Sequence, residues 1–137
     1  MKRTWLYYGV FFSESTKSTI LNYVKSFLEK NGKIIPEDWK EYCSHMTLVF
    51  NHGTEDDQRL AEFYDMFLGE SVGLRTTAIG ISDRAIALEV DFITANLHSH
   101  ITIAIAPDAK PVESNDIVEW IPTEGDFYVT GVYKKVC

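Results

Sequence analysis

The sequence has 137 residues, of which 45% are hydrophobic, so we predict a single compact domain over residues 1–137 with its own core. Its formal net charge of −7 excludes a protein that grips long nucleic acid through many phosphates, because such binding needs an extended basic surface. A substrate of nucleotide size, or a single RNA end, fits this charge.

The first part of the chain predicts a strand followed by a helix. Residues 4–12, TWLYYGVFF, are aromatic and β-branched, which is typical of a strand. Residues 13–32 carry apolar side chains at three- and four-residue spacing, with Ser and Thr available as N-caps, which indicates an amphipathic helix. Residues 33–44 have no clear period and contain Pro36, so we expect a connection there.

The middle of the chain predicts a strand, a helix and a hairpin. The strand covers 45–50, and the helix covers 55–68 and ends at Gly69. Residues 72–83 and 84–91 alternate apolar and polar side chains on either side of a short turn. An antiparallel hairpin is therefore the simplest interpretation of that segment.

The last part of the chain begins with residues 92–99, for which the pattern favours no element. A central strand follows at 100–106, then a short helix at about 112–119 and a final strand at 127–136. Strands and helices thus alternate irregularly along the chain. This order predicts an α+β fold with sheet and helices in two layers.

Cysteine content and hydropathy indicate the setting of the protein. Cys43 and Cys137 are too few for a disulfide framework, so we expect a reducing cytoplasm. The apolar N-terminal run is broken by Ser13 and Glu14, which favours a strand over a signal peptide. Since no stretch is long and apolar enough to cross a bilayer, we predict a cytoplasmic monomer without a membrane partner.

One short pattern occurs twice. HMTLVF at 45–50 and HITIAI at 100–105 both open with a histidine and have a threonine two positions later. Residues two apart in a strand share one face, so His45 lies beside Thr47, and His100 beside Thr102. If the two strands face each other across a cleft, two imidazoles and two hydroxyls meet there. The repeat also suggests two lobes related by an approximate two-fold axis.

This set of side chains suits the hydrolysis of a phosphodiester. One histidine can take a proton from the attacking water while the other gives a proton to the departing oxygen, because imidazole titrates near neutral pH. The two threonine hydroxyls can donate hydrogen bonds to phosphate oxygens and stabilise the charge of the transition state. The residues therefore predict catalysis by His45, Thr47, His100 and Thr102 with no cofactor and no metal.

The paired motifs resemble those of the 2H phosphoesterase superfamily. HMTLVFNHG, AIGISDRAIALEVD and HSHITIAIAPDAKPVESNDI are most similar to the cyclic phosphodiesterase domain of plant-type and fungal-type tRNA ligases, over roughly residues 42–135. The resemblance implies a bilobal α+β fold, with two antiparallel sheets around a central cleft and helices outside. It also implies metal-independent opening of a 2′,3′-cyclic phosphate, in the tRNA ligase group to a 2′-phosphate.

The sequence leaves two other functions open. The same site also fits small viral members of the superfamily, which hydrolyse cyclic di- or oligonucleotide defence signals. A protein of another class, a nucleotide-binding module without catalysis, would keep the fold as a sensor. The motifs do not decide which histidine is the acid, although we take His100 as the base and His45 as the acid.

Further residues are candidates for contacts with the substrate. Tyr8 is our choice for stacking on a nucleobase, with Trp39 and Trp120 as other platforms. We expect Tyr128 and Lys110 to contact the substrate too. Lys134 and Lys135 are further cations that could neutralise a phosphate. His52 lies in a predicted turn and could touch the substrate, but we favour a surface histidine there.

A metal site is the alternative use of the histidines. His98 with His100, and Cys43 with His45, each lie two apart and would present two ligands on one strand face. A zinc site needs three or four ligands, and these pairs would compete with the proposed catalytic pairs. We therefore expect no metal.

Overall fold

The computed structural model describes residues 5–96 and 98–137, so the first residue of the predicted strand 4–12 lies outside the described residues. The chain forms eight strands, two α-helices and one 3₁₀ helix in its described part, which support the predicted α+β class. In chain order they are β1 (Tyr7–Phe11), α1 (Glu14–Lys30), β2 (Lys40–Glu41), β3 (His45–Phe50), α2 (Glu55–Asp65), β4 (Ser71–Ile81), β5 (Ala85–Val90), β6 (His100–Ile105), η1 (Pro111–Asp116), β7 (Glu119–Pro122) and β8 (Tyr128–Val136).

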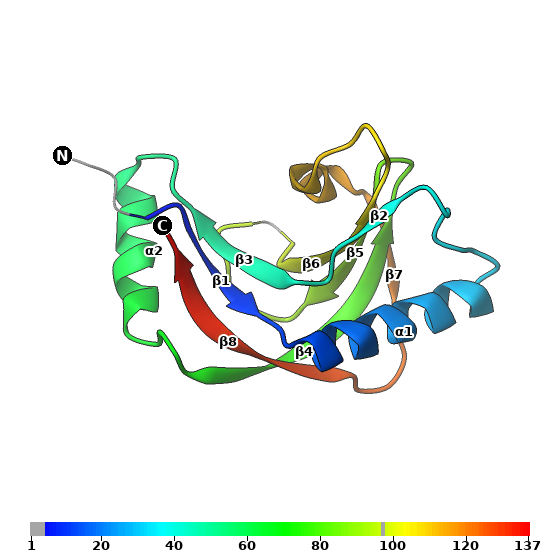
Figure 1. The fold of residues 1–137 in the computed structure, drawn as a ribbon, viewed down its shortest axis with the longest axis horizontal. Coiled ribbons are helices and arrows are strands. Elements are labelled where there is room, and N and C mark those ends of the chain that lie inside the picture. Colours follow the sequence, from blue (N-terminus) through cyan, green and yellow to red (C-terminus); the bar gives the residue numbers. More distant parts are fainter. Residues whose placement is uncertain (1–4, 97) are drawn as a thin grey trace.

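The strands form one antiparallel sheet that closes on itself. The order β6-β3-β1-β8-β4-β5 returns to β6, because β6 pairs with β5 as well as with β3 (Figure 1). β2 extends the sheet from β6, and β7 pairs with β4. The pairing of β3 with β6 consists of one residue pair, Met46 with Ile101. All described strands thus belong to one connected sheet, and the division into two lobes with separate sheets stays a prediction.

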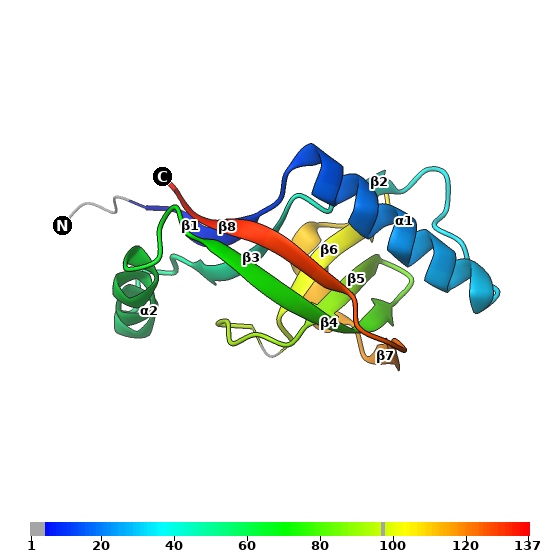
Figure 2. The ribbon, with the colours of Figure 1, turned by 90° about the horizontal axis from the view of Figure 1, so that it is seen from below.

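The two helices lie at opposite ends of the sheet (Figures 1 and 2). α1 begins after Ser13, whose hydroxyl accepts a hydrogen bond from the amide of Thr16, as expected of an N-cap. It buries Ile20, Val24 and Leu28 in the main core. Among the described residues, no helix combines the length and the apolar character that a bilayer crossing requires.

Some element boundaries differ from those predicted. α2 ends at Asp65 instead of residue 68, and β2 and β7 were not expected. The helix predicted at 112–119 is a 3₁₀ helix that ends at Asp116, because Ile117 turns to extended backbone and is buried. The predicted hairpin of 72–83 and 84–91 is confirmed as β4 and β5.

A β-bulge sets which side chains of β3 share a face. The pairing of β3 with β1 shifts by one residue between Tyr8 and Gly9, which leaves Leu48 without a partner on β1. Strict alternation would place Val49 on the side of Thr47, but Val49 is buried and Phe50 is exposed. The bulge therefore adds the Phe50 ring to the face that carries His45 and Thr47.

Candidate active site

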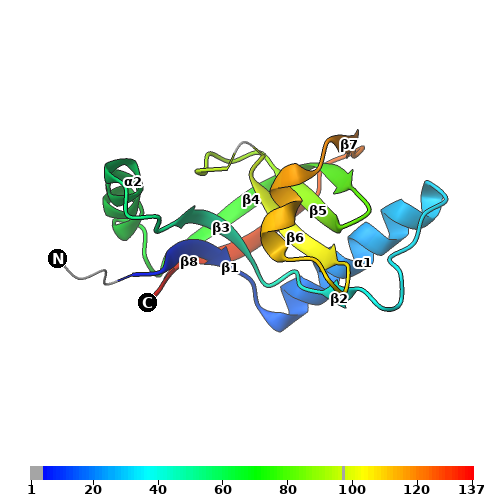
Figure 3. The ribbon, with the colours of Figure 1, turned by 90° about the horizontal axis from the view of Figure 1, so that it is seen from above.

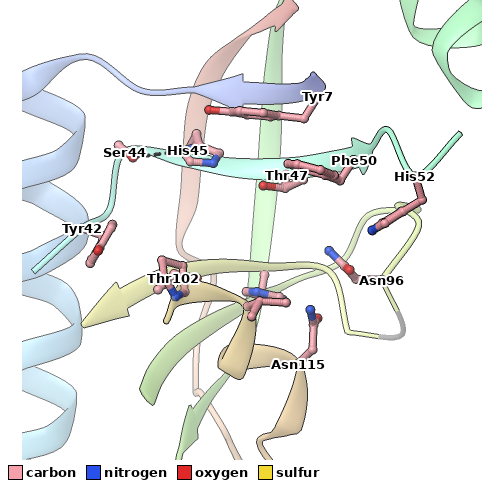
Figure 4. Close-up of a pocket in the computed structure, with 13 residues that line it drawn as sticks. Tyr7, Tyr42, Ser44, His45, Thr47, Phe50, His52, Asn96, Thr102 and Asn115 are labelled. Atoms are coloured by element: carbon pink, nitrogen blue, oxygen red, sulfur yellow. Dashed lines mark hydrogen bonds between the residues drawn. The ribbon is translucent and has the colours of Figure 1, made fainter. Parts of the chain in front are cut away.

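The two H-x-T strands border one cleft. Its volume is about 590 Å³, and its wall includes both histidines and both threonines of the repeated motif (Figure 4). The other lining residues are Tyr7, Tyr42, Ser44, Phe50, His52, Asn96, Pro111, Val112 and Asn115. The structure thus brings together the four residues that the sequence predicts as catalytic.

The first histidine packs against two aromatic rings that are themselves neighbours. The ring centroid of His45 is 4.9 Å from that of Phe11 and 5.3 Å from that of Tyr7, both on β1. Gly9, between these two residues, makes room, since a Cβ there would lie 3.1 Å from Phe11 Cε1 and 3.5 Å from His45 Cδ2. His45 Nδ1 is 2.9 Å from the Ser44 hydroxyl. Strand β1 therefore fixes the plane of the His45 imidazole.

The second histidine is held by the backbone. His100 Nδ1 lies 2.7 Å from the carbonyl oxygen of His98. A carbonyl can only accept, so Nδ1 donates, and the Nε2 of the neutral ring is left with a lone pair. Thr102 Oγ1 is 3.0 Å from the hydroxyl of Ser114, a fully buried residue of η1. Figure 3 shows η1, in gold, over β6.

Burial shapes the acid–base properties of the two histidines. It lowers the pKa of His45 below its usual value, and the proximity of His100 lowers that pKa further. Burial also lowers the pKa of His100, although the hydrogen bond to the His98 carbonyl acts in the opposite direction. Both rings therefore lose a proton more readily than a histidine in water.

Histidines are the titratable side chains that stand out in the described wall of the cleft. None of the described residues that line it is Lys, Arg, Asp or Glu. Lys134 pairs with Gly9 across the sheet, so it lies on the same face as His45, with its ammonium 5.8 Å from the Phe11 ring. Lys135 points to the opposite face, toward Tyr8 and Asp65.

The predicted substrate contacts lie outside the cleft wall. Tyr8 is 1% exposed, donates its hydroxyl hydrogen to Asp65 and packs in the core, because alternation on β1 turns Tyr7 to the cleft instead. Tyr128 is exposed at the start of β8, and Lys110 is exposed at the N-cap of η1, next to the lining residue Pro111. Of the other platforms, Trp39 packs against the core and Trp120 stacks on His98.

The pairs considered as metal ligands are used differently. Cys43 is 1% exposed, and burial raises the pKa of its thiol to about 12. His98 Nδ1 contacts a carboxylate oxygen of Glu89 at 2.5 Å. Over residues 5–96 and 98–137, no three side chains of His, Cys, Asp or Glu come together in a way that could hold a metal ion.

Sequence reasoning missed several residues of the cleft. Tyr7 and Phe50 have nearly parallel rings, with centroids 6.2 Å apart and planes at 9°. Figure 4 shows Phe50, His52, Asn96 and Asn115 beyond Thr47 at one end of the cleft. The aromatic pattern of 4–12 gave a signal for Tyr7, but no local pattern distinguished the two asparagines.

Comparisons with known proteins agree with the resemblance of the motifs. Residues 28–136 match the family model of the fungal tRNA ligase phosphodiesterase domain. No curated protein sequence matches the chain. A crystal structure of a fungal RNA kinase is similar in fold, with a TM-score of 0.66 and 13% identity over 100% of this chain. This chain spans 46% of the length of that kinase chain. The crystal structure of the Thermus thermophilus protein TT0787 has a TM-score of 0.47 at 16% identity, covering 96% of this chain and 94% of that one.

Proposed function

Because the chain belongs to the fungal tRNA ligase phosphodiesterase domain family, we propose that it is a metal-independent hydrolase of 2′,3′-cyclic phosphates at RNA ends or on nucleotides. Membership supports a phosphodiesterase activity in general. The observation that supports this chemistry is the position of both H-x-T pairs on one cleft of about 590 Å³. We also propose that the protein has the two lobes of the 2H phosphoesterase fold and that it is a monomer in the cytoplasm.

In the proposed reaction, water attacks the phosphorus atom and His100 Nε2 takes its proton. The bond from phosphorus to the 3′ oxygen breaks as His45 donates a proton to that oxygen, which leaves a 2′-phosphate and a 3′-hydroxyl. The hydroxyls of Thr47 and Thr102 donate to the non-bridging oxygens as negative charge develops on them.

Two contacts support this division of roles. The Nδ1 donation to the His98 carbonyl keeps a lone pair on His100 Nε2, as a base requires. The faces of Tyr7 and Phe11 lie against His45, and aromatic faces carry negative charge that favours a cationic ring. These ring faces oppose the effects of burial and of His100, which lower the pKa of His45, and we therefore assign His45 the role of the acid.

The wall of the cleft supports a nucleotide with one charged phosphate. Tyr7 and Phe50 offer apolar ring faces on which a base can stack, and the amides of Asn96 and Asn115 can pair with base edges. The described lining residues include no lysine or arginine to neutralise further phosphates. This favours a cyclic mononucleotide or the terminal nucleotide of an RNA over a cyclic oligonucleotide, which carries a charge on each linkage.

The test is hydrolysis in the presence of a chelator. The protein is incubated separately with 2′,3′-cyclic AMP and with cyclic di- and trinucleotides, and the products are resolved by chromatography. We expect adenosine 2′-phosphate from the first substrate. Cleavage of only the cyclic oligonucleotides would indicate an enzyme that hydrolyses cyclic oligonucleotide signals. Saturable binding without turnover would indicate a nucleotide-binding module.

Variants identify the groups that act. His45→Ala and His100→Ala are each expected to lower kcat at least about a hundredfold, the low end of general acid or base catalysis. Thr47→Val and Thr102→Val are expected to lower it roughly tenfold to a hundredfold. Thr130→Val on the exposed face of β8 is the matched control and should leave kcat unchanged. Near-normal turnover by either histidine variant would contradict the mechanism.

A further inference from the structure

The carbonyl that orients His100 lies outside the regular sheet. β6 begins at His100, so the backbone of His98 precedes the strand that carries the motif. One ladder-like contact reaches this segment, from the amide of Val90 to the carbonyl oxygen of Ser99 at 2.8 Å. The buried Ser99 hydroxyl, which donates to the carbonyl of Phe92 at 2.5 Å, holds one end of the peptide that carries the His98 carbonyl. The other end of this peptide is held through His98 itself.

The side chain of His98 is held on two sides. Its Nδ1 lies 2.5 Å from Glu89 Oε2, and the other oxygen of that carboxylate accepts from the Thr77 hydroxyl at 2.9 Å. Its ring stacks on Trp120, with centroids 4.8 Å apart and planes at 19°. Glu89 pairs with His100 across β5 and β6, so the carboxylate is fixed at the level of the proposed base.

Trp120 is itself fixed in place. Its indole N–H donates to the carbonyl of Ile117 at 3.1 Å. Its ring lies directly on Gly80, where a Cβ would come within 2.5 Å of Trp120 Cζ3. Strand β7, which sequence reasoning missed, thus presents a rigid surface to the imidazole of His98.

We propose that Glu89 and Trp120 fix the side chain of His98 and thereby the direction of the His98 backbone carbonyl. This carbonyl accepts the Nδ1 hydrogen of His100, so His100 Nε2 is left as the acceptor in the cleft. His98 and Glu89 are then positioning residues, since His98 is outside the cleft wall and acts through its backbone. This inference rests on the proposed role of His100 in catalysis. It gives a role to the first histidine of HSH at 98–100.

Two variants remove the hydrogen bond between Glu89 and His98, one from each end. Glu89→Leu removes the hydrogen bond to His98, and His98→Phe keeps a ring for Trp120 but has no group to bond to Glu89. In each we expect kcat to fall about tenfold, within the range for residues that orient a working group, with KM changed less than about twofold. Glu89→Gln retains an acceptor for His98, so its kcat should be close to that of the unaltered protein. Asp91→Ala, an exposed acidic residue next to β5, is the matched control.

The direct measurement is the tautomer of His100 by ¹⁵N NMR of labelled protein. We expect the proton on Nδ1 in the unaltered protein and a mixture of tautomers in Glu89→Leu and His98→Phe. An unchanged tautomer in both folded variants would overturn the inference, even if kcat fell. If the unaltered protein hydrolyses no cyclic phosphate, the proposed function fails. The tautomer of His100 still shows whether the contacts of His98 with Glu89 and Trp120 orient the His100 ring. If a variant does not fold by circular dichroism, the other variant decides the result.

Discussion

Gly9→Ala tests whether β1 sets the position of His45. The added Cβ would lie 3.0 Å from the carbonyl oxygen of Met46 and 3.1 Å from Phe11 Cε1, inside the 3.4 Å at which ordinary contact begins. β3 and the Phe11 ring must therefore yield by a few tenths of an ångström. Overpacking of this kind costs about 1–3 kcal/mol, partly offset by roughly 0.4–1 kcal/mol from the stiffer unfolded chain. We expect a net loss of about 1–2 kcal/mol in the free energy of unfolding.

The same displacement should slow the reaction. A misplacement of about 1 Å can cost about a hundredfold, so a shift of a few tenths is expected to lower kcat by roughly three- to tenfold. Urea unfolding gives the stability, with a midpoint lower by roughly 0.5–1 M at ordinary slopes, and hydrolysis of 2′,3′-cyclic AMP gives kcat.

The matched control is Gly73→Ala on β4, where the added Cβ would meet no atom within 4 Å. The midpoint of this variant should stay the same or rise. If Gly9→Ala matched Gly73→Ala in both kcat and urea midpoint, the proposed packing of Phe11 and His45 over Gly9 would be refuted.

Four further outcomes are expected. The lowered pKa values of His45 and His100 place the optimum of a bell-shaped kcat/KM profile below about pH 6.5. Activity should fall as the pH rises above the optimum, because the catalytic acid must be protonated. A maximum of kcat/KM above about pH 7 would contradict this. Phe50→Ala should raise KM for 2′,3′-cyclic AMP several-fold and leave KM for base-free glycerol cyclic phosphate unchanged, as measured by steady-state kinetics. Gly131→Ala should lower the urea midpoint more than Gly9→Ala, since its Cβ would lie 2.5 Å from a core valine methyl. Arg84→Met removes the hydrogen bonds that join Glu113 of η1 to the turn before β5, and it should increase amide hydrogen exchange in η1 while the fold is kept.

The elements with a strong period were predictable from the sequence. Helix α1 follows from the apolar spacing of 13–32, and the hairpin of β4 and β5 follows from alternation. The face shared by each H-x-T pair also follows from alternation, since a strand turns every second side chain to the same side. Strand parity alone therefore predicted that His45 lies beside Thr47, and His100 beside Thr102.

The missed features depend on contacts between distant segments. Tyr8, the residue chosen from the sequence, lies in the core, and its neighbour Tyr7 lies on the cleft. A run of aromatic residues has no local feature that shows which side faces the cleft. The bulge at Leu48, which turns Phe50 into the cleft, appears only when β3 pairs with β1. Strands β2 and β7 have two and four residues, too few for a period, and exist through pairing with β6 and β4.

The position of β1 between β3 and β8 has a consequence for how the protein folds. β1 carries the rings that flank His45, and its second neighbour is the last of the described strands to be synthesised. The pairing of Tyr7 with Val136 joins segments from the two ends of the described chain, and pairings of such long sequence separation raise the contact order and slow folding. The ring of strands therefore closes only after β8 has left the ribosome, and β1, whose rings contact His45, gains its second neighbour only then.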